Sequence, residues 1–273
     1  MSESKVRRVA IACDASCDIR VAVGEAAALA QRWNAELHGV FLEDENLYRL
    51  AGLPFGRQMT WSSAVSESLS GADLEKISSA LGAAMRRAIS EAAAQHGLGW
   101  SFGILRDLPS AAALAEIEAD ILVIDVNPRE FAALWRPPSS WDALTGEHAR
   151  TTLIRRQKPM RPGTVLVLIG ESTDRDKVLA SGISMARPGD KIAALVAGGV
   201  PEQMISAQQS AERLSAPARR EIQFEMGPAG GARLLSRINE LAPVLLVVDA
   251  SDAADPAFRD LLTQTRCDVL LVR

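Results

Sequence analysis

The same order of strand-like and helix-like segments occurs twice in this chain of 273 residues. A β-rich run over residues 6–13 leads through turn formers into an Ala-rich helical stretch over 18–34, and a strand at 164–169 begins the same order again. Strands that alternate with helices predict right-handed βαβ units and a parallel sheet covered by helices on both faces. A repeat of this length indicates two duplicated α/β domains rather than a solenoid.

We predict two tandem α/β domains, each with a five-stranded parallel sheet of the Rossmann-like kind, over residues 1–158 and 163–273. The last strands of the two copies, at about 151–155 and 268–272, should pair with each other. Between the copies, the prolines and cations of residues 155–162 are typical of a solvated linker.

Two insertions, at about 44–71 and about 127–150, make the first copy longer than the second. Both follow the carboxyl end of a strand, which is the edge where open α/β sheets place their ligand crevices. The first insertion is unusually apolar for a loop. It could fold over the strand ends of its own domain, as long ordered loops commonly do, or it could be an arm or lid that docks a protein partner. Its apolar and aromatic residues are Leu47, Tyr48, Leu50, Leu53, Phe55, Met59 and Trp61.

The composition excludes several classes of function. The chain has 30 Lys plus Arg against 34 Asp plus Glu, a net charge of −4, whereas a general nucleic-acid binder needs a concentrated basic surface. No run approaches the roughly 20 apolar residues that span a bilayer. Residues 1–5 lead into a strand-like segment without the apolar core of a signal peptide. We therefore expect a cytoplasmic protein that neither inserts into membranes nor binds nucleic acid.

Three cysteines, Cys13, Cys17 and Cys267, are too few for a disulfide framework. Cys13 and Cys17 flank a strand-to-helix turn and could pair or sense redox state, since a helix N-terminus favours the thiolate. Their spacing differs from the Cys-x2-Cys of redox and zinc motifs, which favours a buried strand cysteine beside an exposed one. The three histidines have no neighbouring cysteine or second histidine, which favours ordinary polar packing over a metal site.

Three short segments carry a resemblance to a known family. They are the Val-Ala-Ile-Ala-Cys-Asp-Ala-Ser strand and turn over 9–16, the Ala-Glu-Leu-His-Gly-Val strand over 35–40, and the Cys-Asp-Val-Leu-Leu-Val strand over 267–272. With the order of elements, they resemble the universal stress protein family in its tandem form. The resemblance implies a cytoplasmic α/β protein that dimerises, usually through the last strand. Some members of the family bind ATP and others do not.

The ATP-binding branch of that family carries a Gly-x2-Gly-x9-Gly-Ser/Thr loop directly after the fourth strand. Its glycines let backbone amides approach the phosphates closely. The matching positions of this chain hold no glycine, although a terminal hydroxyl survives in each copy. These positions are Asp125, Pro128 and Pro138 followed by Ser139 in the first copy, and Asp249, Asp252 and Leu262 followed by Thr263 in the second.

These replacements oppose phosphate binding. Each proline removes a backbone donor, and each aspartate adds negative charge where a triphosphate must sit. A carboxylate about 4 Å from a phosphate charge costs on the order of 4 kcal/mol at an effective dielectric constant near 20. The resemblance therefore implies ATP binding that is lost or much weakened. The remnant nucleotide pocket that it implies consists of Asp14, Ser16, Val40, Asp125, Ser139 and Thr263.

We predict a stress-related regulatory or adaptor protein without a cofactor. It is not expected to be an enzyme, because the sequence has no nucleophile elbow, Walker loop or metalloprotease motif. A protein partner would bind the 44–71 insertion or the sheet edges, and a homodimer of tandem chains is a further option. The alternative is a stress protein that binds ATP or AMP at a non-standard phosphate site, built from the 170–172 turn and Thr263. An electron-transfer-flavoprotein-like subunit is a third option, although no matching flavin or AMP loop is evident.

Overall fold

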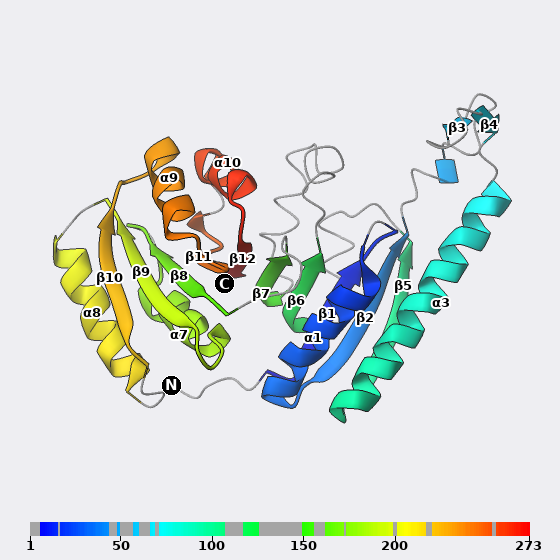
Figure 1. Cartoon of the computed structure of the whole chain (residues 1–273), viewed down its shortest axis with the longest axis horizontal. Coiled ribbons are helices and arrows are strands. Elements are labelled where there is room, and N and C mark those ends of the chain that lie inside the picture. Colours follow the sequence, from blue (N-terminus) through cyan, green and yellow to red (C-terminus); the bar gives the residue numbers. More distant parts are fainter. Residues whose placement is uncertain are drawn as a thin grey trace. The chain divides into compact units, whose positions relative to one another are not determined.

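The computed structural model of the chain has two compact units, Met1–Asn127 and Pro128–Arg273 (Figure 1). Within them the structure describes residues 6–15, 17–43, 48–49, 57–59, 66–68, 71–106, 117–125, 149–155, 162–171, 173–198, 201–216, 220–252 and 255–273.

The first unit is built on a parallel sheet. Its described strands are β1 (Arg8–Cys13), β2 (Glu36–Glu43), β5 (Trp100–Arg106) and β6 (Ala119–Asp125). β1 lies between β6 and β2, and β5 pairs with the other side of β2. A separate antiparallel hairpin, β3 (Arg57–Met59) with β4 (Ser66–Ser68), lies within the 44–71 insertion.

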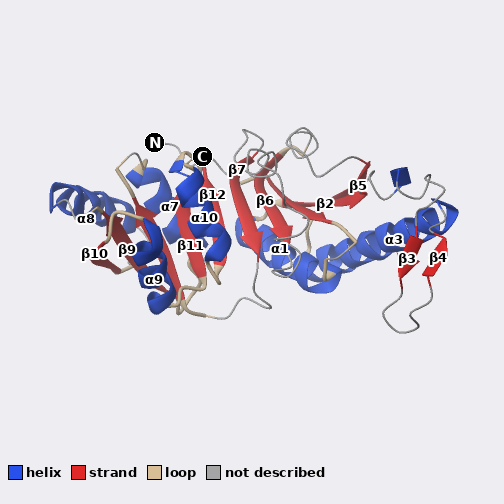
Figure 2. Ribbon diagram, turned by 90° about the horizontal axis from the view of Figure 1, so that it is seen from above, coloured by secondary structure: helices blue, strands red, loops and turns tan. Residues whose placement is uncertain are grey.

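Two helices, α1 (Ile19–Trp33) and α3 (Gly71–His96), lie along one face of this sheet (Figure 2). At Gly39 of β2, a Cβ atom would lie 1.8 Å from Cδ1 of Ile89, so the Ile89 side chain of α3 packs directly against this glycine. Because successive strand residues point to opposite faces, Glu36 and His38 of β2 lie on the side away from α3. The buried face of α1 is made of small and apolar side chains: Ala22, Val23, Ala26, Ala27, Leu29 and Ala30.

The second unit repeats the order of elements. Its strands are β7 (Ala149–Arg155), β8 (Thr164–Ile169), β9 (Lys191–Ala197), β10 (Ile222–Gly227), β11 (Leu245–Asp249) and β12 (Asp268–Val272). They follow the order β10-β9-β8-β11-β12-β7, and only the pairing of β12 with β7 is antiparallel. Its helices are α7 (Arg175–Met185), α8 (Pro201–Ser215), α9 (Gly231–Leu241) and α10 (Pro256–Gln264).

Helices cover both faces of the second sheet. α7 contacts α8, and α9 contacts α10. Since parallel crossovers are right-handed and the strand order reverses between β8 and β11, the two helix pairs lie on opposite faces. The carboxyl ends of β8 and β11 meet at this switch point, which positions the candidate site of the second unit.

The pairing predicted for the last strands of the two copies is confirmed. Val269 of β12 lies opposite Ile154 of β7, and the N–H of Arg273 donates to the carbonyl of Arg150 at 2.9 Å. The compact units divide at residue 127, so β7 falls in the second unit with its partner strand. The prediction that Arg155 lies in a solvated linker is wrong. Arg155 ends β7, and it is only 1% exposed.

The α/β class and the tandem order of elements are also confirmed. The second insertion, 127–150, lies outside the described residues except for the first residues of β7. In the described part of the chain, every helix is too short or too polar to cross a membrane.

Candidate functional site

The remnant nucleotide pocket predicted in the first unit lies at the carboxyl edge of its sheet. Asp14 directly follows the last residue of β1 and is half-buried. Asp125 is the last residue of β6, and the preceding Ile124 pairs with Ala12, so β1 and β6 end at the same level. Val40 is buried on β2, in register with Ala12. The strands therefore bring Asp14 and Asp125 to one edge, with Val40 deeper in the sheet.

The other predicted pocket residues are not brought to that edge by the described structure. Ser16 and Ser139 lie outside the described residues. Thr263 belongs to α10 of the second unit, where its hydroxyl is exposed and donates to the carbonyl of Asp260 at 2.7 Å. This is an ordinary bond within one helical turn, and the role of Thr263 at a phosphate stays a prediction.

A disulfide joins the two ends of the turn that carries Asp14. Cys13 and Cys17 have Cα atoms 5.6 Å apart and their sulfur atoms are bonded. The backbone N–H of Cys17 also donates to the carbonyl of Asp14 at 3.3 Å. The sequence favoured two separate cysteines. The structure differs because the turn brings the last strand residue and the residue before the helix cap within the distance that a disulfide spans.

The equivalent turn of the second unit is held by a hydroxyl and a carboxylate. The N–H of Gly170 donates to Oγ1 of Thr173 at 2.8 Å, and this hydroxyl donates to Oδ2 of Asp252 at 2.6 Å. Thr173 is buried. At Gly170, an added Cβ would lie 3.2 Å from Oγ1 of Thr173, so the turn is tightly closed over this hydroxyl.

Asp249, at the end of β11, fixes the start of α7. Its Oδ2 accepts a hydrogen bond from the N–H of Asp174 at 3.1 Å, and its Oδ1 accepts from the N–H and the hydroxyl of Ser251 at 2.8 and 2.6 Å. Asp174 in turn caps α7 by accepting from the N–H of Lys177 at 3.3 Å. Among the described residues of this edge, the backbone amides of Gly170, Asp174 and Ser251 are therefore bonded to side-chain oxygens of the chain itself.

Thr173 and Ser251 were not among the residues predicted for the site. The sequence did carry a signal for Thr173, because a hydroxyl residue immediately before the N-cap Asp174 can bond a backbone amide of the preceding turn. Ser251 follows Asp249 by two residues, which is the spacing of an Asx turn. Neither signal indicates which distant carboxylate the turn will meet.

A second polar cluster anchors the beginning of the 44–71 insertion. Nε of Arg106, at the end of β5, lies 2.6 Å from Oε2 of Glu43, and its guanidinium stacks 4.9 Å from the centre of the Tyr48 ring. Burial alone would raise the pKa of Glu43, but hydrogen bonds from Ser78 and Arg106 hold that pKa below its ordinary value. Tyr48 therefore packs over the strand ends of its own unit.

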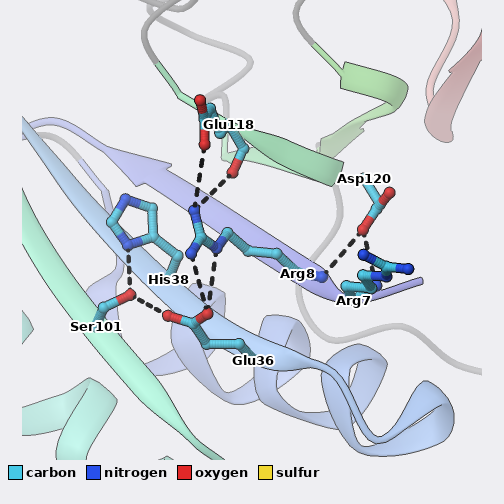
Figure 3. A network of polar contacts seen from close by, with 7 residues as sticks. All are labelled: Arg7, Arg8, Glu36, His38, Ser101, Glu118 and Asp120. Atoms are coloured by element: carbon cyan, nitrogen blue, oxygen red, sulfur yellow. Dashed lines mark hydrogen bonds and ion pairs between the residues drawn. The ribbon is translucent and has the colours of Figure 1, made fainter. Parts of the chain in front are cut away.

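A third polar network lies at the amino ends of β1, β2 and β5 (Figure 3). Arg8 donates from Nη2 to Oε2 of Glu36 at 3.1 Å, and its backbone N–H donates to Asp120 at 3.1 Å. The hydroxyl of Ser101 donates to Oε1 of Glu36 at 2.5 Å and lies 2.8 Å from Nδ1 of His38. Since the serine proton goes to the carboxylate, His38 is not the base of an activated nucleophile.

The electrostatics of this network keep Glu36 charged and His38 neutral. The hydrogen bond from Ser101, followed by the contacts with Arg8, lowers the pKa of Glu36. Burial, followed by the positive charge of Arg8, lowers the pKa of His38. Among the described residues, no three His, Cys, Asp or Glu side chains are placed to hold a metal ion.

Together the two units define a tandem protein of the Rossmann-like α/β class. A universal stress protein from Archaeoglobus fulgidus DSM 4304 has a similar structure, with a TM-score of 0.63 at 8% identity over 97% of this chain and 96% of that chain. A protein of unknown function from Pseudomonas aeruginosa PAO1 matches with a TM-score of 0.57 at 17% identity, over 98% of this chain and 92% of that chain. A protein from P. aeruginosa UCBPP-PA14, provisionally named a universal stress protein, has the same TM-score of 0.57 and the same 17% identity, over 98% and 93% of the two chains.

The similarity in fold to these proteins thus covers nearly the full length of the chain. No protein-family model matches the sequence, and no curated protein matches it either. At such low identities the similarity establishes the fold, so any conclusion about a ligand must come from the residues at the sheet edges.

Proposed function

We propose that this chain is a stress-related regulatory or adaptor protein of the universal stress type, with ATP binding lost or much weakened and without enzymatic activity. The observation that carries this proposal is the bonding of Asp249 and Asp252 at the switch point of the second unit. Their carboxylates accept from the N–H of Asp174 and the hydroxyl of Thr173, at the positions where an ATP-binding relative has glycine.

The energetics follow from those contacts. A triphosphate at this edge would have to displace carboxylates from their donors and would meet their negative charge. Each carboxylate about 4 Å from a phosphate charge costs on the order of 4 kcal/mol at an effective dielectric constant near 20. Breaking the hydrogen bonds of a buried carboxylate such as Asp249 adds to that cost. Both contributions oppose binding, so cellular ATP would not occupy this edge.

The alternative phosphate site, built from the 170–172 turn and Thr263, gains no support from the described residues. The amide of Gly170 already donates to Thr173, and the hydroxyl of Thr263 already donates within its own helix. The first unit retains Asp14 of the remnant pocket that the family resemblance implies, but Asp125 stands at the first glycine position there. The sequence of the first unit thus keeps part of that pocket but none of the glycines that let backbone amides approach a phosphate.

An adaptor also needs a surface for a partner, and the edge of the first sheet offers apolar side chains. Trp100 and Ile104 on the edge strand β5 are 38% and 53% exposed, and Ile77 of α3 is 54% exposed. β5 is the edge strand of the sheet in the described part of the chain, and apolar residues exposed on an edge strand are a common means of association. We place the docking of a cytoplasmic protein, or of a second copy of the chain, on this edge or on the 44–71 insertion.

Calorimetric titration tests the nucleotide part of the proposal. The purified chain is titrated with Mg-ATP and with AMP, and neither should bind with micromolar affinity. Asp252→Asn is the matched variant, since it removes the charge and keeps the size of the side chain. Micromolar binding to the unmodified chain would overturn the proposal.

Sedimentation velocity tests whether the β5 edge binds a second copy of the chain. If a second copy binds the β5 edge, the chain sediments as a dimer and Ile104→Lys makes it a monomer with unchanged circular dichroism. A dimer that Ile104→Lys leaves intact would place the association elsewhere.

A further inference from the structure

We propose that Cys13 and Cys17 form a reversible dithiol–disulfide switch that closes and opens the turn between β1 and α1. The proposal stands on the position of the pair in the fold. Cys13 is the last residue of β1 and is 1% exposed, and Cys17 is half-buried in the turn before α1. Their Cα atoms are 5.6 Å apart, within the range of roughly 4.4–6.8 Å that disulfides span.

The pair differs from the third cysteine in two features that matter for exchange, a bonded partner and the partial exposure of one member, Cys17. Cys267 is buried directly before β12 and is not disulfide-bonded. Cys17 is partly accessible to a small reagent and lies two residues before the first residue of α1, Ile19, where the positive end of the helix dipole favours a thiolate. The structure therefore offers one attacking thiol, Cys17, and one resolving thiol, Cys13.

Thiol–disulfide exchange with a low-molecular-weight disulfide, such as glutathione disulfide, completes the chemistry. The Cys17 thiolate attacks one sulfur of that disulfide, so a mixed disulfide forms and one glutathione thiolate leaves. The Cys13 thiol then loses its proton to solvent, and its thiolate attacks Sγ of Cys17 and releases the second glutathione thiolate. Two cysteine thiols are oxidised and one glutathione disulfide is reduced to two thiols, so atoms and electrons balance.

The switch would act on the turn that carries Asp14. In the oxidised chain, the sulfur bridge and the hydrogen bond from Cys17 N–H to the carbonyl of Asp14 close the same short loop. Reduction removes the covalent closure of this loop, so the backbone around Asp14 gains freedom. The corresponding turn of the second unit, 170–174, contains no cysteine, so only the first copy would respond. The inference holds whether or not the chain binds nucleotide.

Peptide mass spectrometry tests the switch directly on the full, folded chain. Trypsin cleaves after Arg8 and Arg20, so one peptide, residues 9–20, contains both cysteines, and Cys267 falls in a separate peptide, 267–273. The chain is equilibrated in glutathione buffers of increasing oxidised fraction and then alkylated. The 9–20 peptide should change from doubly alkylated to a form that lacks two hydrogens and carries no alkyl group. Excess dithiothreitol should reverse this change without unfolding the chain.

Two variants sharpen the test. Cys267→Ser should titrate like the original chain. Cys17→Ser should abolish the oxidised 9–20 form at every glutathione ratio. The proposal is overturned if peptide 9–20 keeps both thiols, if it only accumulates a glutathione adduct, or if its disulfide resists dithiothreitol until the chain is denatured.

Discussion

The turn after the first strand of each copy is stabilised by different chemistry. Between β1 and α1, a disulfide joins Cys13 and Cys17, and the N-cap Asp18 makes no side-chain capping bond. Between β8 and α7, Asp174 caps the helix while Asp249 tethers it to the end of β11. A duplicated topology thus fixes where the turn lies but not what holds it. Each copy has to be assigned its function from its own residues.

Among the substitutions that test this comparison, the largest loss of stability is expected at Asp249. Asp249→Ala removes a buried carboxylate that accepts hydrogen bonds from the N–H of Asp174 and from both donors of Ser251. We expect the free energy of unfolding of the second unit to fall by about 3 kcal/mol. Urea unfolding followed by circular dichroism measures the change. Glu171→Ala, at an exposed position of the same turn, is the control, and equal midpoints for the two variants would contradict the account.

Loss of the disulfide should have the next largest effect, confined to the first unit. Closing so short a loop stabilises a folded chain by about 2 kcal/mol in the chain-entropy model. Thermal unfolding of the unmodified chain should therefore shift to lower temperature when reductant is added. Cys17→Ser should unfold at that lower temperature with or without reductant. If Cys17→Ser is as stable as the oxidised chain, the bridge does not stabilise the turn.

A smaller effect is expected from the hydroxyl that closes the second turn. Thr173→Val keeps the shape of the side chain but removes the hydroxyl that accepts from the N–H of Gly170 and donates to Asp252. We expect a loss of about 1.5 kcal/mol. Thr173→Ser retains the hydroxyl and should recover most of the stability. Chemical unfolding of both variants measures the two contributions, and a larger loss in Thr173→Ser than in Thr173→Val would mean that packing of the methyl group dominates.

The smallest expected effect is a pH dependence of the unfolding free energy, which should again differ between the two units. Burial, followed by the charge of Arg8, lowers the pKa of His38, so between pH 7 and 5 the unfolded chain takes up a proton that the folded chain resists. Stability contributed by neutral His38 is present above pH 6.5 and falls as the pH drops below that value. The equivalent position in the second sheet holds an alanine, because Ala193 pairs with Leu166 as His38 pairs with Ala10. This pH dependence is therefore expected for the first unit.

Unfolding free energies measured from pH 5 to 7 test this dependence. His38→Gln should flatten the pH profile of the first unit, and His96→Gln on α3 is the matched control. A profile that keeps its slope in His38→Gln would assign the pH dependence to other groups.

The sequence was sufficient for the fold because hydrophobic periodicity and turn chemistry report on local structure. The apolar run 244–248 and the turn formers at 14–16 and 170–172 placed the strands and the carboxyl edge of each sheet. The polar partners at that edge could not be predicted, because Thr173 and Asp252 are 79 residues apart and meet only through the sheet. Arg155 shows the same limit, since its charge suggested solvent while strand pairing buries it.

The central claim is that carboxylates of the chain occupy the switch point of the second unit, where an ATP-binding relative would hold phosphate. Hydrogen exchange tests it most directly, measured over the 170–178 and 249–252 segments with and without millimolar Mg-ATP. We expect the same deuterium uptake in both conditions, because the amides of Gly170, Asp174 and Ser251 are already bonded to Thr173 and Asp249. Slower exchange in these segments on addition of Mg-ATP would show that phosphate displaces those bonds, and would contradict the account.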